Sequence, residues 1–480
     1  MFDSIKQLLN RDIKIGLIYS LGDFIVIGSR FILFLIYGSI LTSAEYGMFA
    51  VLTAISTVVG ILLTMGLKAA AFKHYFDYPT LREKQSYYST LWFFLTIGSA
   101  VLTIIIGFLW GKIPFPILLN VPLDPYIKIA LWSSYFSNVY SLVAFEILRA
   151  SRKPSLFIAL AIGNATTLIV FAIIFVYFLG LGVIGSLLTT LITGILWAFI
   201  YTHSLRQLLR FTFSIQKLKN ALTYSLPFIP HFLSHWLLNF SDRIILEQSV
   251  SLDNVGVYSL GYNFGTAQQV VANSGNNAIM PYYGRAAKDE SYFDRIPKLN
   301  STYISIMALF ALGISIFSDE MIHWFFSESY SQSADIVFWI ALGFFSIALY
   351  YGPMNTITLI AGKSKFIWVI TLIAGLVNIL LNLLLIPHFG IIAAAINTLI
   401  GYVLMFILIF FYSLKLSPMK YEFKRLIFVV SGLLIGIAVD KLLNPQAISG
   451  EIGLDSFIFL IYAFLVYQTN MSSPLGDNYD

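Results

Sequence analysis

The chain has 480 residues, of which 58% are hydrophobic and only 11% are charged. A soluble domain carries about 25% charged residues, so this composition excludes an ordinary soluble enzyme and a disordered scaffold. The 29 Lys and Arg residues against 24 Asp and Glu give a net charge of +5, and the absence of cysteine excludes disulfides, thiolate metal sites and cysteine nucleophiles.

Long apolar runs predict membrane-spanning helices along the chain. A hydrocarbon core about 30 Å thick requires about 20 mainly apolar residues per helix, and fourteen segments meet or approach this length, the ninth and the last two being short. In chain order they are residues 16–40, 46–67, 88–110, 126–148, 155–179, 183–202, 226–246, 255–280, 303–317, 336–360, 366–386, 391–412, 426–439 and 457–466. We therefore expect an all-α polytopic membrane protein with about 14 transmembrane helices.

The segment before the first span has its own pattern. Apolar residues at positions 2, 5, 8, 9 and 13 alternate with basic residues at positions 6, 11 and 14. Such a pattern favours an amphipathic helix at the bilayer surface, and a disordered tail is the alternative interpretation.

The distribution of basic residues predicts the orientation. When the loops are assigned alternately to the two faces, 23 of the 29 Lys and Arg residues fall on one face and only Lys112, Lys128 and Lys441 on the other. The positive-inside rule then places both termini in the cytoplasm of a multi-pass protein. The net charge reflects this asymmetry, so we expect no nucleic-acid partner.

The two halves of the chain resemble each other in sequence, and matching stretches are separated by a nearly constant number of residues. Gly182-Val183-Ile184-Gly185 matches Gly390-Ile391-Ile392-Ala393, and two further matches are displaced by similar distances. Six spans separate equivalent points, so the repeats are parallel. We expect a six-helix lobe with the amphipathic segment at 1–210, a second six-helix lobe at 211–415, and a terminal helix pair with a cytoplasmic tail at 416–480. A substrate cavity is expected between the lobes.

Ionisable residues inside the spans are the candidate site residues, because each costs about 2.5–3.5 kcal/mol on insertion scales. Arg30 in the first span and Arg243 in the seventh are predicted to bind an anionic head group, since guanidinium donates paired hydrogen bonds to phosphate oxygens. Asp23 and Asp242 are candidates for proton coupling. In the alternative interpretation, Asp and Arg only neutralise each other between packed helices.

His231 and His235 share a helical face with Asp242 and are further candidates for proton coupling. Their spacing also fits two metal ligands, but no third ligand is evident, so no metal site is predicted. Nearer the cytoplasmic ends of spans, Glu146 is expected to pair with Arg149, and Lys68 to extend its amine to the surface.

Prolines interrupt two of the predicted spans. Pro227 and Pro230 precede the histidines, and Gly352 and Pro353 break the tenth span. These four residues are hinge candidates, with a static kink as the equal alternative.

Several stretches together resemble the Wzx-type polysaccharide-unit flippases of the multidrug/oligosaccharidyl-lipid/polysaccharide (MOP) exporter superfamily. The resemblance covers nearly the whole chain. Each motif alone is weakly specific in sequence, but the order and spacing of the motifs are more specific. The stretches are Glu45-Tyr46-Gly47, 238–246 (LNFSDRIIL), 255–259 (VGVYS), 362–365 (GKSK), 378–387 (NILLNLLLIP) and 389–395 (FGIIAAA).

The resemblance implies a transporter without a catalytic site or cofactor, located in a bacterial or archaeal cytoplasmic membrane. It would flip an undecaprenyl-pyrophosphate-linked oligosaccharide from the inner to the outer leaflet, for cell-surface polysaccharide biosynthesis. Alternating access of a V-shaped cavity would move the substrate, with Arg30 and Arg243 matching the family's cationic cleft residues. Coupling to H⁺ or Na⁺ is left open. Membrane lipids, a polysaccharide polymerase and a chain-length regulator are the expected partners.

Two other function classes stay open. An ion-coupled multidrug exporter would share the superfamily fold, but the arginines within the spans disfavour cationic drugs. A membrane polysaccharide polymerase would require a larger outer loop with catalytic residues, for which Asp319-Glu320 is the only hint.

Overall fold

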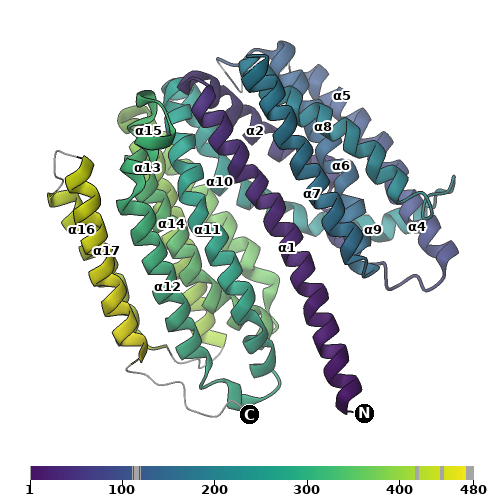
Figure 1. Ribbon diagram of the computed structural model, residues 1–480. Coiled ribbons are helices and arrows are strands. Elements are labelled where there is room, and N and C mark those ends of the chain that lie inside the picture. Colours follow the sequence, from purple (N-terminus) through teal and green to yellow (C-terminus); the bar gives the residue numbers. More distant parts are fainter. Residues whose placement is uncertain are drawn as a thin grey trace. The chain divides into compact units, whose positions relative to one another are not determined.

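The structure is a computed structural model that describes residues 2–110, 112, 118, 120–416, 421–443 and 448–471. Every regular element within these residues is helical, which confirms the predicted all-α class for the described part (Figure 1). The α-helices are α1 (Phe2–Ile40), α2 (Ser43–Thr64), α3 (Leu67–Lys73), α4 (Leu81–Phe93), α5 (Ser99–Trp110), α6 (Lys128–Ala150), α7 (Pro154–Ala172), α8 (Gly182–Ser204), α9 (Ile215–Ser225), α10 (Ile229–Ser249), α11 (Leu252–Ala286), α12 (Ile296–Ile316), α13 (Ser318–Phe325), α14 (Ser333–Asn355), α15 (Ile367–Leu416), α16 (Phe423–Leu443) and α17 (Ile448–Met471).

The N-terminal segment is continuous with the first span, because α1 is helical from Phe2 to Ile40. The side chains of residues 1–17 lie outside the described part, and so does the predicted amphipathic face that they form. Most of the predicted cytoplasmic tail, from residue 472, also lies outside the described residues.

Ten helical segments in the described part are long and apolar enough to cross a membrane. One of them, α15, contains the two predicted spans 366–386 and 391–412 and turns between them at Gly390, where φ is 60°. Three further predicted spans coincide with α6, α10 and α11, which are richer in polar residues. The positions of the predicted spans therefore all fall on helices, while the count of 14 crossings stays a prediction.

Helix starts follow local capping chemistry. Thr42 caps α2, and its hydroxyl accepts a hydrogen bond from the backbone N–H of Glu45 while the Glu45 carboxylate accepts from the Thr42 N–H. Thr80 and Glu83 form the same reciprocal arrangement at the start of α4. Both pairs satisfy N–H groups that a helix start otherwise leaves without partners.

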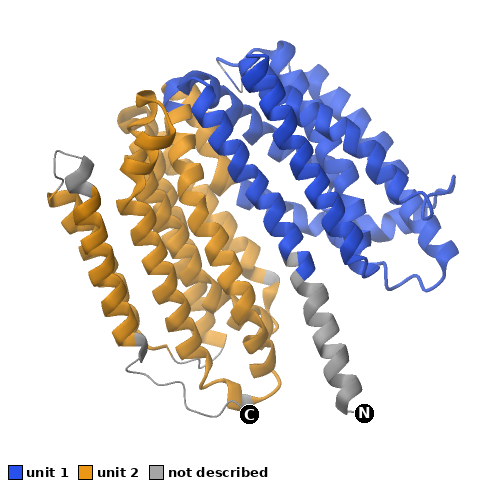
Figure 2. Cartoon of the chain, viewed as in Figure 1, with its two compact units in different colours: residues 1–236, 251–255 blue, residues 237–250, 256–480 orange. Residues whose placement is uncertain are grey.

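The first compact unit comprises residues 1–236 and 251–255 (Figure 2). Small residues allow its helices to approach closely. Gly194 of α8 lies directly against α6, and Gly22 of α1 lies against the ring of Phe157 on α7. These two contacts hold α8 against α6 and α1 against α7, and α6 and α1 are the helices that carry Arg149 and Asp23.

The second compact unit comprises residues 237–250 and 256–480. Its apolar core joins α12 and α14 to the terminal helices α16 and α17. The Tyr462 hydroxyl of α17 donates a hydrogen bond to the carbonyl of Val429 on α16 at 2.8 Å, and the Tyr462 ring covers Gly432. The terminal helix pair is thus packed into this unit, and the boundary between the units falls within α10.

The predicted repeat has a counterpart in the backbone. Gly182 and Gly390, which occupy matching positions in the two halves, both adopt positive φ, at 52° and 60°. Arg152 and Gly362 also have positive φ, at 53° and 64°, and each lies just before a helix of its half. These turns recur at a nearly constant displacement along the chain, as the predicted repeat would require.

Candidate substrate-binding and coupling residues

Arg30 lies in the middle of the candidate span Leu21–Ile40 and is exposed within its unit. It makes no ion pair with any described residue. Ile27 and Phe31 on the same helix are also exposed, at 41% each. The guanidinium of Arg30 therefore lies among exposed apolar side chains of α1.

Asp23 does not pair with Arg30, although both lie on α1. Its carboxylate accepts a hydrogen bond from Nη2 of Arg149 on α6 at 2.5 Å. Nearby, the Tyr19 hydroxyl donates to the carbonyl of Leu148 at 3.1 Å, so the two helices are also joined through the backbone. The sequence indicated the charge of Asp23 but not its partner, which is 126 residues away.

The ion pair of Asp23 belongs to a larger charged cluster in unit 1. Glu146, with a side chain only 7% exposed, lies 3.9 Å from Nη1 of Arg149, which confirms the predicted pair. Lys68 of α3 approaches Glu146 to 3.7 Å, and its side chain is 61% exposed. Two cations and two carboxylates therefore alternate, and their charges balance.

His231 and His235 lie in the first half of α10, within unit 1. His231 is half-buried and His235 is exposed. Trp236 next to them donates its indole N–H to the carbonyl of Ala54 in α2 at 2.8 Å, which ties this part of α10 to unit 1. No group of three or more His, Asp or Glu residues in the described part is arranged to hold a metal ion.

Asp242 and Arg243, in contrast, form a buried ion pair inside unit 2. Their side chains are 1% and 4% exposed, and Nη1 of Arg243 lies 2.7 Å from Oδ1 of Asp242. The same Nη1 donates to the carbonyl of Asn239 at 2.5 Å. The hydroxyl of Tyr258 donates to the other carboxylate oxygen of Asp242.

Aromatic side chains complete this network. The Arg243 guanidinium carbon lies 4.0 Å from the ring centroid of Tyr262, within the range of a cation–π contact. Tyr262 and Tyr402 donate their hydroxyls to Oδ1 of Asn239 at 3.1 and 2.7 Å. Arg243 is thus neutralised and enclosed, as the alternative interpretation of the charged residues expected, and binding substrate would require the network to open.

Sequence reasoning did not identify the tyrosines of this network. Tyr258 and Tyr262 are four residues apart on α11 and therefore share one helical face. One signal in the sequence could have indicated them. The span after the Asp-Arg pair carries two tyrosines on one face. Tyr402 comes from α15, and nothing in the sequence links it to Asn239.

A buried row of amides extends along α15 near this network. Asn397 donates to Oδ1 of Asn382 at 3.0 Å, and Asn382 donates to Oδ1 of Asn378 at 3.1 Å. All three residues are 0% exposed. The row crosses the turn at Gly390 and so connects the two straight parts of α15.

The hinge candidates lie at two positions in the fold, the junction of α9 with α10 and the last turns of α14. Pro227 lies in a 3-10 turn at Leu226–Phe228, and Pro230 is the second residue of α10, so both mark the transition from α9 to α10. Pro353 lies inside α14, which continues to Asn355 and passes into a π turn at Thr356–Ile360. The tenth span is therefore not broken at Pro353, because the change in helix type comes after it; the hinge role of all four residues stays a prediction.

A profile of the family described as "Polysaccharide biosynthesis protein" matches residues 38–335, more than half of the chain. The chain belongs to this family. No curated protein matches its sequence.

Solved structures show which fold this polysaccharide biosynthesis protein has. It is similar to lipid II flippase MurJ in an inward closed conformation, with a TM-score of 0.77 and 16% identity over 95% of this chain and 100% of that chain. An inward-facing multidrug resistance transporter of the MATE family gives a TM-score of 0.63 at 16% identity, over 84% of this chain and 95% of that chain. A mutant of the Vibrio cholerae MATE transporter VcmN gives 0.55 at 15%, over 87% and 99%.

The family match confirms the polysaccharide-biosynthesis resemblance that the sequence motifs indicated, and the fold is similar to that of a MATE transporter of the MOP superfamily. This polysaccharide biosynthesis protein therefore has a helical fold similar to that of a lipid II flippase and of MATE transporters, with ten described helical segments long and apolar enough to cross a membrane.

Proposed function

We propose that the protein flips a lipid-linked oligosaccharide, carried on undecaprenyl pyrophosphate, from the inner to the outer leaflet by alternating access. The observation that carries the proposal is the match of residues 38–335 to a family of polysaccharide biosynthesis proteins. A transporter in such a pathway must move a sugar intermediate, and sugars assembled on a membrane are carried by lipids. The likeness of the fold to a lipid II flippase agrees with this substrate class.

The surroundings of Arg30 support an anionic substrate. A guanidinium in the middle of a span is costly unless a water-filled path or an anionic group serves it, and Arg30 has no described carboxylate partner. The pyrophosphate of a lipid-linked sugar would provide two or more acceptor oxygens in the geometry that guanidinium favours. Arg30 is therefore the first substrate-binding residue to test, ahead of the enclosed Arg243.

Reconstitution tests this function directly. The purified chain in proteoliposomes should transfer a fluorescently labelled undecaprenyl-pyrophosphate oligosaccharide to the outer leaflet, where an added glycosidase or quencher detects it. Protein-free liposomes of the same composition provide the control for leakage and spontaneous transfer. Folded wild-type protein that moves no labelled lipid above the protein-free rate would refute the proposal.

We propose coupling to a proton or sodium gradient, with Asp23, Asp242, His231 and His235 as candidate residues. Asp23 is half-exposed and pairs with Arg149, whereas Asp242 is buried and held by Arg243 and Tyr258. Imposed gradients of pH or of Na⁺ across the same proteoliposomes separate the two ions. Transfer that responds to neither gradient would exclude both.

We further propose that the protein lies in the cytoplasmic membrane with both termini inside, supplying a polysaccharide polymerase and its chain-length regulator. The concentration of 23 basic residues on one predicted face supports this orientation. Reporter fusions at residue 480 and in the predicted outer loop at Lys112 should be active on opposite sides. Activity on the same side would refute the topology.

The MATE matches favour one alternative, export of small drugs. Cells that lack the gene should then accumulate cationic dyes, and the Arg30→Ala variant should export them as well as wild type does. Loss of surface polysaccharide without any change in drug sensitivity would favour the lipid-linked substrate.

A further inference from the structure

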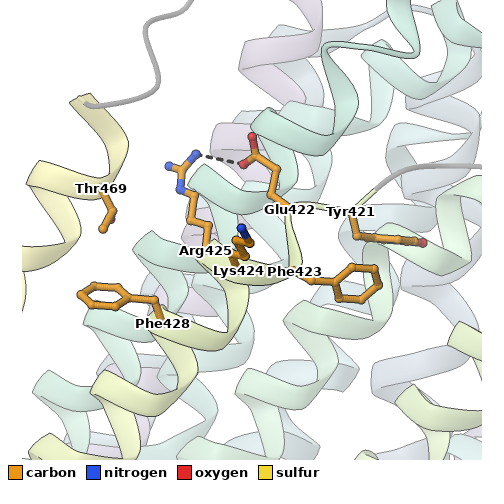
Figure 3. A pocket seen from close by; sticks show the side chains of 7 residues that line it. All are labelled: Tyr421, Glu422, Phe423, Lys424, Arg425, Phe428 and Thr469. Atoms are coloured by element: carbon orange, nitrogen blue, oxygen red, sulfur yellow. Dashed lines mark hydrogen bonds and ion pairs between the residues drawn. The ribbon is translucent and has the colours of Figure 1, made fainter.

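A pocket of about 630 Å³ lies at the start of α16, where the end of α17 approaches it (Figure 3). Its volume is within the range of small-ligand sites, about 300–1,000 Å³. The lining residues are Tyr421, Glu422, Phe423, Lys424, Arg425, Phe428 and Thr469. The pocket belongs to unit 2 alone, and the candidate span Phe423–Leu443 begins in it, so the pocket lies at a membrane boundary.

The pocket contains two cations and one carboxylate. Arg425 is held in place because Nη1 lies 3.1 Å from Glu422 and Nη2 donates to the hydroxyl of Thr302 at 3.2 Å. Its side chain is only 10% exposed, and its Nε has no hydrogen-bond partner. Lys424 is exposed and makes no ion pair with any described residue. The lining therefore carries one uncompensated positive charge, at Lys424, beside the guanidinium that pairs with Glu422.

Aromatic rings lie beside these charges. Phe423 and Phe428 line the same pocket and are 53% and 43% exposed. Phe428 follows Lys424 by four residues, so both lie on one face of α16, with the ring one turn deeper into the span. Exposed apolar residues continue along this helix at Ile427 and Ile435, at 63% and 62%.

The order of these groups matches the order of groups in a phospholipid. A lipid places its phosphate at the membrane boundary and its acyl chains toward the hydrocarbon. Basic residues at the end of a span attract anionic lipids with about 1 kcal/mol per Lys or Arg. We propose that this pocket binds an anionic glycerophospholipid, with its phosphate on Lys424 and Arg425 and its first acyl carbons on Phe428.

Native mass spectrometry of the detergent-purified full chain tests this site. Titration with phosphatidylglycerol should show one retained lipid, which Lys424→Ala weakens about fivefold. Lys441→Ala, at the opposite end of α16 and outside the pocket, is the control and should retain the lipid; Lys441 differs from Lys424 in that it pairs with Asp319 at 3.6 Å. Because Lys424 is exposed and unpaired, its substitution leaves the packing of unit 2 intact.

Further variants and ligands in the same experiment distinguish binding of the lipid from binding of other anions. Phe428→Ala should weaken phosphatidylglycerol but leave the weak binding of inorganic phosphate unchanged, because only the lipid contacts the ring. Zwitterionic phosphatidylcholine should bind about fivefold more weakly than phosphatidylglycerol. Equal retention by wild type and Lys424→Ala, equal binding of phosphatidylcholine, or displacement by millimolar inorganic phosphate or by undecaprenyl pyrophosphate would overturn the proposal.

Discussion

Arg30 on α1 and Arg243 on α10 are the two arginines within predicted spans, and their surroundings are opposite. Arg243 is 4% exposed, pairs with Asp242 and lies against the ring of Tyr262. Arg30 is exposed, and no described residue balances its charge. A charge that the protein itself neutralises supports the fold of its unit, whereas one left without a counter-ion can interact with a substrate.

The largest expected effect concerns stability at Arg243. Arg243→Ala should lower the free energy of unfolding by about 3–5 kcal/mol, because the carboxylate of Asp242 would be left buried without its counter-ion. Thermal unfolding in detergent measures this loss. The double variant Asp242→Leu, Arg243→Met removes both charges and should recover much of the stability. An Arg243→Ala protein as stable as wild type would show that the pair does not support the unit.

Arg30 should show the reverse pattern. Arg30→Ala should leave the unfolding temperature nearly unchanged but slow transfer of lipid-linked oligosaccharide about 10- to 100-fold, since hydrogen bonds to charged groups contribute about 1.5–3 kcal/mol. Ile27→Ala, a similarly exposed residue one turn away, is the control for surface changes on α1. Unchanged transfer by Arg30→Ala would remove Arg30 from the substrate path.

The sequence predicted the helices and the charged positions better than the partners of those charges. Apolar length locates a span because the requirement is local, and the predicted spans 366–386 and 391–412 are indeed the two parts of α15 around Gly390. Helical spacing tells which residues of one helix share a face, but not which other helix packs on it. The partner of Asp23, Arg149 on α6, was therefore not predicted.

The same limitation applies to Arg243. Its surroundings include Tyr258 and Tyr262 from α11 and Tyr402 from α15; the spacing of the first two places them on one face of α11, but nothing in the sequence shows that this face packs on Arg243. The substrate-binding role predicted for Arg243 rested on its position within a span, which is equally compatible with a structural pair. The pairing of Glu146 with Arg149 was predictable because both residues lie three apart on one helix.

A smaller effect is expected at the edge of the Arg243 network. Tyr402→Phe removes one of the two hydroxyls that donate to Oδ1 of Asn239, and Tyr262 still satisfies this oxygen. The loss in unfolding free energy should be about 0.5–1.5 kcal/mol, the net contribution of one hydrogen bond. Tyr177→Phe on the exposed surface is the control. A loss as large as that of Arg243→Ala would mean that the hydroxyl of Tyr402 is essential to the whole network.

The smallest effect is expected at Asp23, on the same helix as Arg30. Its carboxylate is 50% exposed and Arg149 is 29% exposed, so solvent screens the pair and its contribution is about 0–1 kcal/mol. Asp23→Asn should therefore change the unfolding temperature by an amount similar to that of Asp124→Asn, which breaks an exposed pair with Lys128. Arg149 retains Glu146 as a partner, which limits the loss further. A loss above about 2 kcal/mol would contradict this, and would mean that the ion pairs of α1 contribute to its unit as strongly as the buried pair of α10 does to its own.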